Sequence, residues 1–236
     1  MRTVDRSKGS QLALPPTSAS STSRRLWALL AAVESAAAAV AVILDLLIPT
    51  IVLLVMAALS MLVRRTGLGS LGLHRIAERS LVWKMLAFAA LWSLFQIGVT
   101  KPIANHVSGE KQDLSGFEGL EGDIGMLAAY LVLGWTLAAF GEELAYRGYL
   151  LTRVREAFGG GWMALVVAVL VSSLLFGVAH GEQGLIGVFV VTLDALAWAG
   201  LRLHYKTLWA SILAHGFNNT LGFIAFFFMG PIYGLW

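Results

Sequence analysis

The residues that could carry chemistry in this chain form three short groups in its C-terminal half. In each group, polar or aromatic side chains lie four residues apart, a spacing that places them on one face of a helix. The groups are Glu142, Glu143 and Arg147, then Phe176 and His180, and finally His215 and Asn219. Ionisable residues are costly inside apolar segments, so each of them is a candidate functional residue.

The two neighbouring carboxylates are expected to have different roles. Glu143 lies four residues before Arg147, the orientation that favours an ion pair within the helix, so its charge can be neutralised locally. Glu142 lies about 100° round an α-helix from Glu143 and has Tyr146, not a cation, at its own i+4 position. Glu142 is therefore left to face another group, and such a carboxyl group suits proton transfer.

The two histidines and Asn219 add groups that hold protons or donate hydrogen bonds. His180 and His215 can each hold or pass a proton near neutral pH. His215 and Asn219 present an imidazole and a carboxamide together, a pair that can donate hydrogen bonds to a developing oxyanion. Asn218 would replace Asn219 in this role if the helix were rotated. A lone intramembrane histidine is also often an interhelical hydrogen-bonding residue.

The chain that positions these residues is too apolar for a water-soluble domain. Of its 236 residues, 58% are hydrophobic and 13% are charged, against roughly 25% charged in soluble domains. A soluble domain of this length cannot bury so much apolar surface. This composition argues against a soluble enzyme, a disordered chain and a nucleic-acid-binding module. The absence of cysteine excludes a disulfide scaffold, a thiolate metal site and a cysteine nucleophile.

The apolar segments predict an all-α, polytopic membrane bundle of about seven transmembrane helices. A hairpin within residues 26–63 supplies the first two, with Asp45 at its tip and Pro49 opening the second helix. The other spans are expected at 81–100, 124–158, 162–180, 184–203 and 207–229. Glu34 and Asp194 are ionisable residues in these spans with no motif around them. We expect Glu34 to face a polar gap, and Asp194 to bond a neighbouring helix or line the cavity.

The distribution of basic and acidic residues among the loops predicts the orientation of the bundle in the membrane. The N-terminal tail, the 64–84 loop, the 153–155 turn and the 202–206 turn are basic, whereas the 101–123 loop is acidic. Because basic loops stay in the cytoplasm, we expect a cytoplasmic N-terminus and an acidic loop on the far side. The basic segments are interpreted as anchors to anionic lipid headgroups and not as a nucleic-acid-binding surface.

In its three residue groups the sequence resembles the CPBP (CAAX protease and bacteriocin-processing, Abi) family of intramembrane glutamic endopeptidases. The family's first motif is two Glu, three residues and Arg; its second is Phe, three residues and His; its third is His, three residues and Asn or a similar residue. All three occur here in order, and the similarity covers about residues 124–222. Residues 1–123 match only as generic apolar spans.

The resemblance implies hydrolysis of a peptide bond within the membrane by an endopeptidase that needs neither a metal nor another cofactor. By motif position, Glu142 would be the general base, and His180 would help to hold and activate water. His215 and Asn219 would stabilise the tetrahedral oxyanion. The expected partners are membrane lipids and a membrane-associated protein or peptide, with or without a prenyl group, cleaved near its C-terminus or in its leader.

The resemblance also implies a supporting set of residues. Glu143, Arg147 and Phe176 would maintain the site. The resemblance also identifies residues 124–229 as the catalytic core. The polar, basic composition of residues 1–25 itself predicts a disordered cytoplasmic tail, the apolar runs place the N-terminal transmembrane helices and polar loop at 26–123, and 230–236 is a short tail. The expected location is a bacterial cytoplasmic membrane.

Three other functions stay open on the sequence. A metalloprotease would use Glu and His as Zn²⁺ ligands, although the H-E-x-x-H spacing is absent. A non-proteolytic membrane scaffold or bacteriocin-immunity protein would use the motif residues only to hold the bundle together. A proton-coupled transporter would use Glu142 and the histidines as a relay, but the chain shows no inverted repeat.

Overall fold

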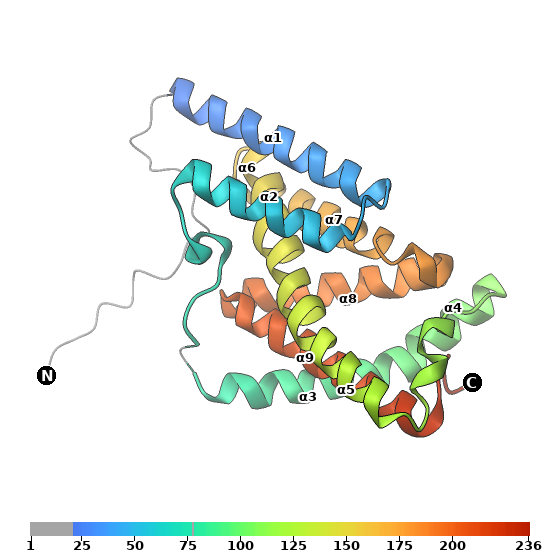
Figure 1. Cartoon of the computed structure of the whole chain (residues 1–236). Coiled ribbons are helices and arrows are strands. Elements are labelled where there is room, and N and C mark those ends of the chain that lie inside the picture. The colour runs from blue at the N-terminus through green and yellow to red at the C-terminus, as the bar shows by residue number, and fades with distance from the viewer. Residues whose placement is uncertain (1–20, 77) are drawn as a thin grey trace, which may run out of the picture.

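The computed structural model describes residues 21–76 and 78–236, and within these ranges every regular element is a helix (Figure 1). In chain order they are α1 (Ser21–Ile43), α2 (Pro49–Arg64), η1 (Leu68–Leu71), α3 (Ser80–Phe95), η2 (Gln96–Thr100), α4 (Lys101–Ser108), η3 (Ser115–Leu120), α5 (Ile124–Leu133), η4 (Gly134–Leu150), α6 (Leu151–Ala157), α7 (Trp162–Val178), η5 (Gly181–Gln183), α8 (Gly184–Tyr205) and α9 (Leu208–Met229). The expected tail at residues 1–25 lies outside the described residues as far as residue 20, and α1 begins at Ser21.

Five helical stretches are long and apolar enough to cross a membrane. They are Ser21–Ile43, Ser80–Ser108, Ile124–Ala157, Gly181–Tyr205 and Leu208–Met229. Two further apolar helices, α2 and α7, have 16 and 17 residues. At 1.5 Å per residue they are about 24–26 Å long, shorter than the roughly 30 Å hydrocarbon core. The all-helical, membrane-spanning class is confirmed, and the count of seven spans stays a prediction.

The turns between helices follow from the residues that occupy them. Pro49 begins α2, where its missing N–H would have no helical partner. Gly159 and Gly160 have φ of 85° and 79°, a backbone region that glycine adopts without steric cost. The glycines therefore end α6 and allow α7 to return antiparallel to it.

The continuous helix formed by α5, η4 and α6 crosses the middle of the bundle (Figure 1). It has α1 and α2 on one side, and α3 and α9 on the other. This central helix carries the first residue group, whereas α7 and α9 carry the second and third. The fold therefore brings the three groups to one helix junction.

Two glycines allow the close approaches at this junction. A Cβ atom added at Gly177 would lie 2.6 Å from the carbonyl oxygen of Val188, and one at Gly216 would lie 2.5 Å from the Trp135 ring. Real Cβ atoms do not come this close to other atoms. Glycine at these positions is what lets α7 pack on α8, and α9 on η4, directly beside the motif residues.

A buried network of ion pairs ties α1, α2 and α6 together. Arg64 lies 3.0 Å from Glu34 and 3.3 Å from Glu156, and Arg153 pairs with Glu156 at 2.5 Å and lies 3.7 Å from Glu34. The Arg64 guanidinium also lies 4.9 Å from the Trp27 ring centroid. Glu34 was expected to face a polar gap; it is instead neutralised by two arginines from other helices.

Arg202 was expected in a basic turn at the lipid headgroups, and the structure corrects this. The residue is 3% exposed, and its guanidinium donates to the carbonyl oxygens of Arg147 and Leu71, the latter at 3.0 Å. Arg202 therefore fastens α8 to η4 and to the loop after α2.

Replacing Arg64 should destabilise the bundle, because Arg64→Met leaves two carboxylates short of a partner. Removing one member of a buried ion pair costs about 3–5 kcal/mol, and we expect the free energy of unfolding in detergent to fall by about 3 kcal/mol. The neighbouring Arg65 is exposed, so Arg65→Met is the matched control and should change little. Equal stability of the two variants would show that the network contributes nothing.

Candidate active site

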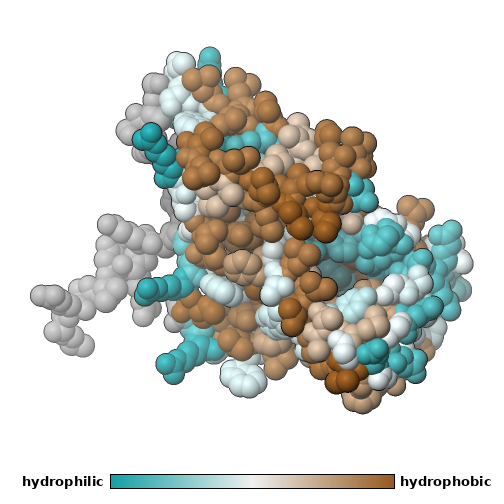
Figure 2. Space-filling view, in the orientation of Figure 1, coloured by the Kyte–Doolittle hydropathy of each residue, from teal (hydrophilic) through white to brown (hydrophobic). Residues whose placement is uncertain are grey.

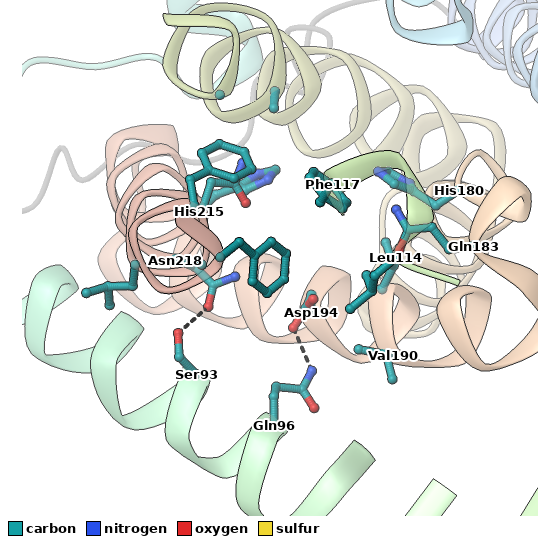
Figure 3. Close-up of a pocket in the computed structure, with 18 of the residues that line it drawn as sticks. Ser93, Gln96, Leu114, Phe117, His180, Gln183, Val190, Asp194, His215 and Asn218 are labelled. Carbon is teal, nitrogen blue, oxygen red and sulfur yellow. Dashed lines mark hydrogen bonds between the residues drawn. The ribbon is translucent and has the colours of Figure 1, made fainter. Parts of the chain in front are cut away.

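The three residue groups meet at a single cavity of about 700 Å³. Its wall includes Glu142, His180, His215, Asn218 and Asn219. Figure 3 shows His180 and His215 on either side of the view, and Asp194 on α8 between them. Residues separated by more than seventy positions thus face one space, as the antiparallel arrangement of the expected spans requires.

The rest of the cavity wall is divided between apolar and polar side chains. The apolar part comes mainly from α3, α5, η4 and α9, with Leu94, Leu133, Leu137, Phe223 and Phe226. Polar side chains include Ser93, Gln96, Lys101, Gln112 and Gln183. A mostly apolar wall with a few placed polar groups is typical of ligand-binding cavities.

Glu143 is the centre of the buried polar cluster beneath the cavity. Its Oε1 lies 3.1 Å from Arg147 Nη1 and 3.1 Å from His215 Nδ1. The side chains of Glu143 and Arg147 are both fully buried. The predicted ion pair between Glu143 and Arg147 is confirmed. The contact with His215 was not predicted, because 72 positions separate the two residues.

The helix that carries both carboxylates is π-helical over the whole of η4, Gly134–Leu150. The angle of about 100° expected between Glu142 and Glu143 holds only for an α-helix. A π-helix closes its hydrogen bonds between residues five apart and has a wider turn, so Glu142 and Glu143 diverge less than they would in an α-helix. One imidazole ring accordingly meets both carboxylates, with His215 Nε2 4.0 Å from Glu142 Oε2 and Nδ1 on Glu143.

The hydrogen bonds of the histidines define which ring nitrogens face the cavity. His180 lies in the turn just after α7, and its Nδ1 is 2.8 Å from the carbonyl oxygen of Phe176. A carbonyl only accepts, so Nδ1 carries the proton and Nε2 of the neutral ring is an acceptor. His215 likewise directs Nδ1 to Glu143, which leaves its Nε2 for the Glu142 side of the site.

Phe176 packs among the charged and aromatic groups of the site. The Arg147 guanidinium lies 4.0 Å from its ring centroid, within the range of a cation–π contact. Ring centroids of His180 and His215 lie 4.8 Å and 6.1 Å away. Phe176 therefore packs beside both imidazoles and against the buried cation.

Asp194 is a cavity residue whose partners the sequence did not identify. Its carboxylate accepts hydrogen bonds from Trp92 Nε1 at 2.6 Å and Gln96 Nε2 at 2.7 Å. Asp194 thus both bonds a neighbouring helix and lines the cavity. No local pattern could have revealed this, because the partners lie about a hundred positions earlier in the chain.

The two asparagines of the third group differ in their partners. The side-chain oxygen of Asn218 accepts a hydrogen bond from the Ser93 hydroxyl at 2.8 Å (Figure 3). Asn219 lies one turn after His215 and also lines the cavity. Both carboxamides are therefore close to where a ligand would sit.

In the part of the chain that the structure describes, no three His, Asp or Glu side chains are grouped to hold a metal ion.

The protein is a membrane-spanning helical bundle with a buried carboxylate–histidine cluster beside a cavity. These features define its class as an integral membrane protein with an enzyme-like site. Residues 124–221 match the family model of Rce1-like type II CAAX prenyl endopeptidases. This segment holds all three residue groups, so the resemblance of residues 124–221 to the CAAX protease (CPBP) family is confirmed. Comparison with curated proteins and with solved structures gave no match.

The contacts of Glu143 predict a structural role that Glu142 does not share. Glu143→Gln removes the charge that neutralises Arg147, and leaving a buried cation unpaired costs about 3–5 kcal/mol. We therefore expect a clearly lower melting temperature in detergent for Glu143→Gln. Glu142→Gln is the matched control and should melt close to the unsubstituted protein. An unchanged melting temperature in Glu143→Gln would contradict the ion-pair role.

Proposed function

We propose that this protein is a metal-independent glutamic endopeptidase that cleaves a peptide bond inside the membrane. The observation that carries the proposal is that Glu142 faces the same cavity as the acceptor Nε2 of His180 and the His215/Asn219 pair. The match of residues 124–221 to Rce1-like CAAX prenyl endopeptidases supports peptide-bond hydrolysis as the reaction.

In the proposed reaction, Glu142 acts as the general base. A water molecule held between Glu142 and His180 gives a proton to the Glu142 carboxylate while its oxygen bonds to the carbonyl carbon of the substrate. When the tetrahedral intermediate collapses, the C–N bond breaks and the leaving amine takes that proton from Glu142. The carboxylate is then restored, and the products are a carboxylic acid and an amine.

His215 and Asn219 stabilise the oxyanion in this scheme. The Asn219 amide group donates without a change of charge. His215 Nε2 can donate only when the ring carries both protons, and the Glu143 carboxylate on Nδ1 balances the charge of that ring. Glu143, Arg147 and Phe176 hold the imidazole in place and take no direct part in bond making.

The substrate proposed for this site is a peptide segment of a membrane-associated protein. The mostly apolar cavity wall favours an aliphatic or prenyl group next to the scissile bond. A library of peptides made with and without a prenyl group, incubated with the purified protein, identifies which of the two is cleaved.

Removing the proposed base should abolish cleavage without unfolding the protein. General acid–base groups contribute about 10²–10⁴-fold to rate, so Glu142→Ala should lower kcat by about 10³-fold. The measurement is product formation by mass spectrometry, and the melting temperature of each protein is the control for folding. Adding a metal chelator to the unsubstituted protein should leave its rate of cleavage unchanged. Wild-type turnover in Glu142→Ala would overturn the assignment, and loss of activity with chelator would favour a metalloprotease.

The oxyanion assignment distinguishes two adjacent asparagines. Removing one oxyanion donor costs about 10²–10³-fold in kcat, and we expect this loss for Asn219→Ala with little change in KM. Asn218→Ala, which loses only the bond to Ser93, should have a much smaller effect. A larger loss of kcat in Asn218→Ala than in Asn219→Ala would transfer the role to Asn218.

A further inference from the structure

The two ends of the bundle carry opposite charge. Exposed cations gather at the start of α1, the loop from α2 to α3, and the turn from α8 to α9; we call this the basic end. They are Arg24, Arg25, Arg65, Arg75, Arg79, Lys84 and Lys206. Exposed carboxylates gather at the loop between α4 and α5 and the turn between α7 and α8, here called the acidic end. They are Glu110, Asp113, Glu118, Glu121, Asp123 and Glu182.

These two ends lie on opposite sides of the molecule. In Figure 1 the start of α3 and the start of α9 lie at the left, whereas α4 and the C-terminus lie at the right. The apolar helices run between them, and Figure 2 shows mainly hydrophobic surface over the intervening helices. A bundle with this asymmetry inserts with its basic loops in the cytoplasm.

The cavity belongs to the acidic end. Among its lining residues, Gln112, Leu114 and Phe117 come from the loop between α4 and α5, Gln183 from the turn before α8, and Ile232 from the C-terminal segment. None of the described residues in the 64–79, 157–161 or 205–207 connections at the basic end lines it. The connections that contribute to the cavity wall are thus the ones that the charge rule places outside.

Packed side chains fill the bundle between the site and the basic end. Tyr146, Tyr149 and Leu150 follow the two carboxylates along η4 and have no exposed surface. Beyond them lie the buried Arg202 and the Arg64 ion-pair network. A peptide coming from the basic end would have to displace this core, whereas the connections at the acidic end line the cavity themselves.

We infer that the substrate reaches Glu142 from the acidic end, which is the extracytoplasmic face of the membrane. The substrates are then exported peptides, or extracytoplasmic segments of membrane-anchored chains. The nature of this ligand rests on the proposed peptidase function, but the route into the cavity does not.

Single-cysteine variants test the route cleanly, because the 236-residue chain contains no cysteine. Ser115→Cys marks the acidic end and Thr66→Cys the basic end, and both positions are exposed. Ala138→Cys marks the cavity wall, and its neighbour Ala139→Cys, with no exposed surface, is the matched control. Each variant, expressed in cells, is treated with a membrane-impermeant trimethylammonium thiosulfonate before and after permeabilisation.

The inference predicts that Ser115→Cys and Ala138→Cys are modified in intact cells. Thr66→Cys should react only after permeabilisation, and Ala139→Cys only after denaturation. Modification of Thr66→Cys in intact cells would show the reverse orientation and overturn the inference. The inference would also be overturned if Ala138→Cys were protected from modification in intact cells, whether or not permeabilisation exposes this cysteine. Because labelling needs no cleavage, an inactive protein with the predicted pattern would count against the proposed function alone.

Discussion

The structure depends on a single carboxylate, that of Glu143, which is completely buried between Arg147 and His215. A charge at such a position must be paired, because leaving it alone in an apolar interior is strongly unfavourable. The pairing connects helices: Arg147 lies over the Phe176 ring of α7 and His215 belongs to α9. The carbonyl group of Arg147 accepts a bond from Arg202 of α8. Satisfying one buried charge therefore fixes the four elements that surround the reacting groups.

This constraint explains why two adjacent glutamates can have different properties. Glu143 is paired through Oε1 with both Arg147 and His215. Glu142 faces the cavity, where its Oε2 lies 4.0 Å from the imidazole Nε2 of His215. The wide turn of the π-helix brings both carboxylates to the same ring. Departures from α-helical geometry of this kind are frequent at functional sites, and here the departure coincides with the family's first motif.

The sequence predicted those features that depend on local spacing. Apolar runs and the positions of Pro49 and Gly159 located the helices, and the i,i+4 spacing predicted the pair between Glu143 and Arg147. The sequence did not reveal the π-helix over Gly134–Leu150. It also missed the contact of Glu143 with His215, since such a contact depends on how distant helices meet.

The site depends on the contact of Glu143 with His215 as well as on its contact with Arg147. A double-mutant cycle tests this dependence most directly: the free energies of unfolding of Glu143→Gln, His215→Gln and the double variant are compared with that of the unsubstituted protein. Residues in direct contact show coupling energies of about 0.5–3 kcal/mol, and the account predicts a stabilising coupling in this range. Additive effects of the two substitutions would contradict it.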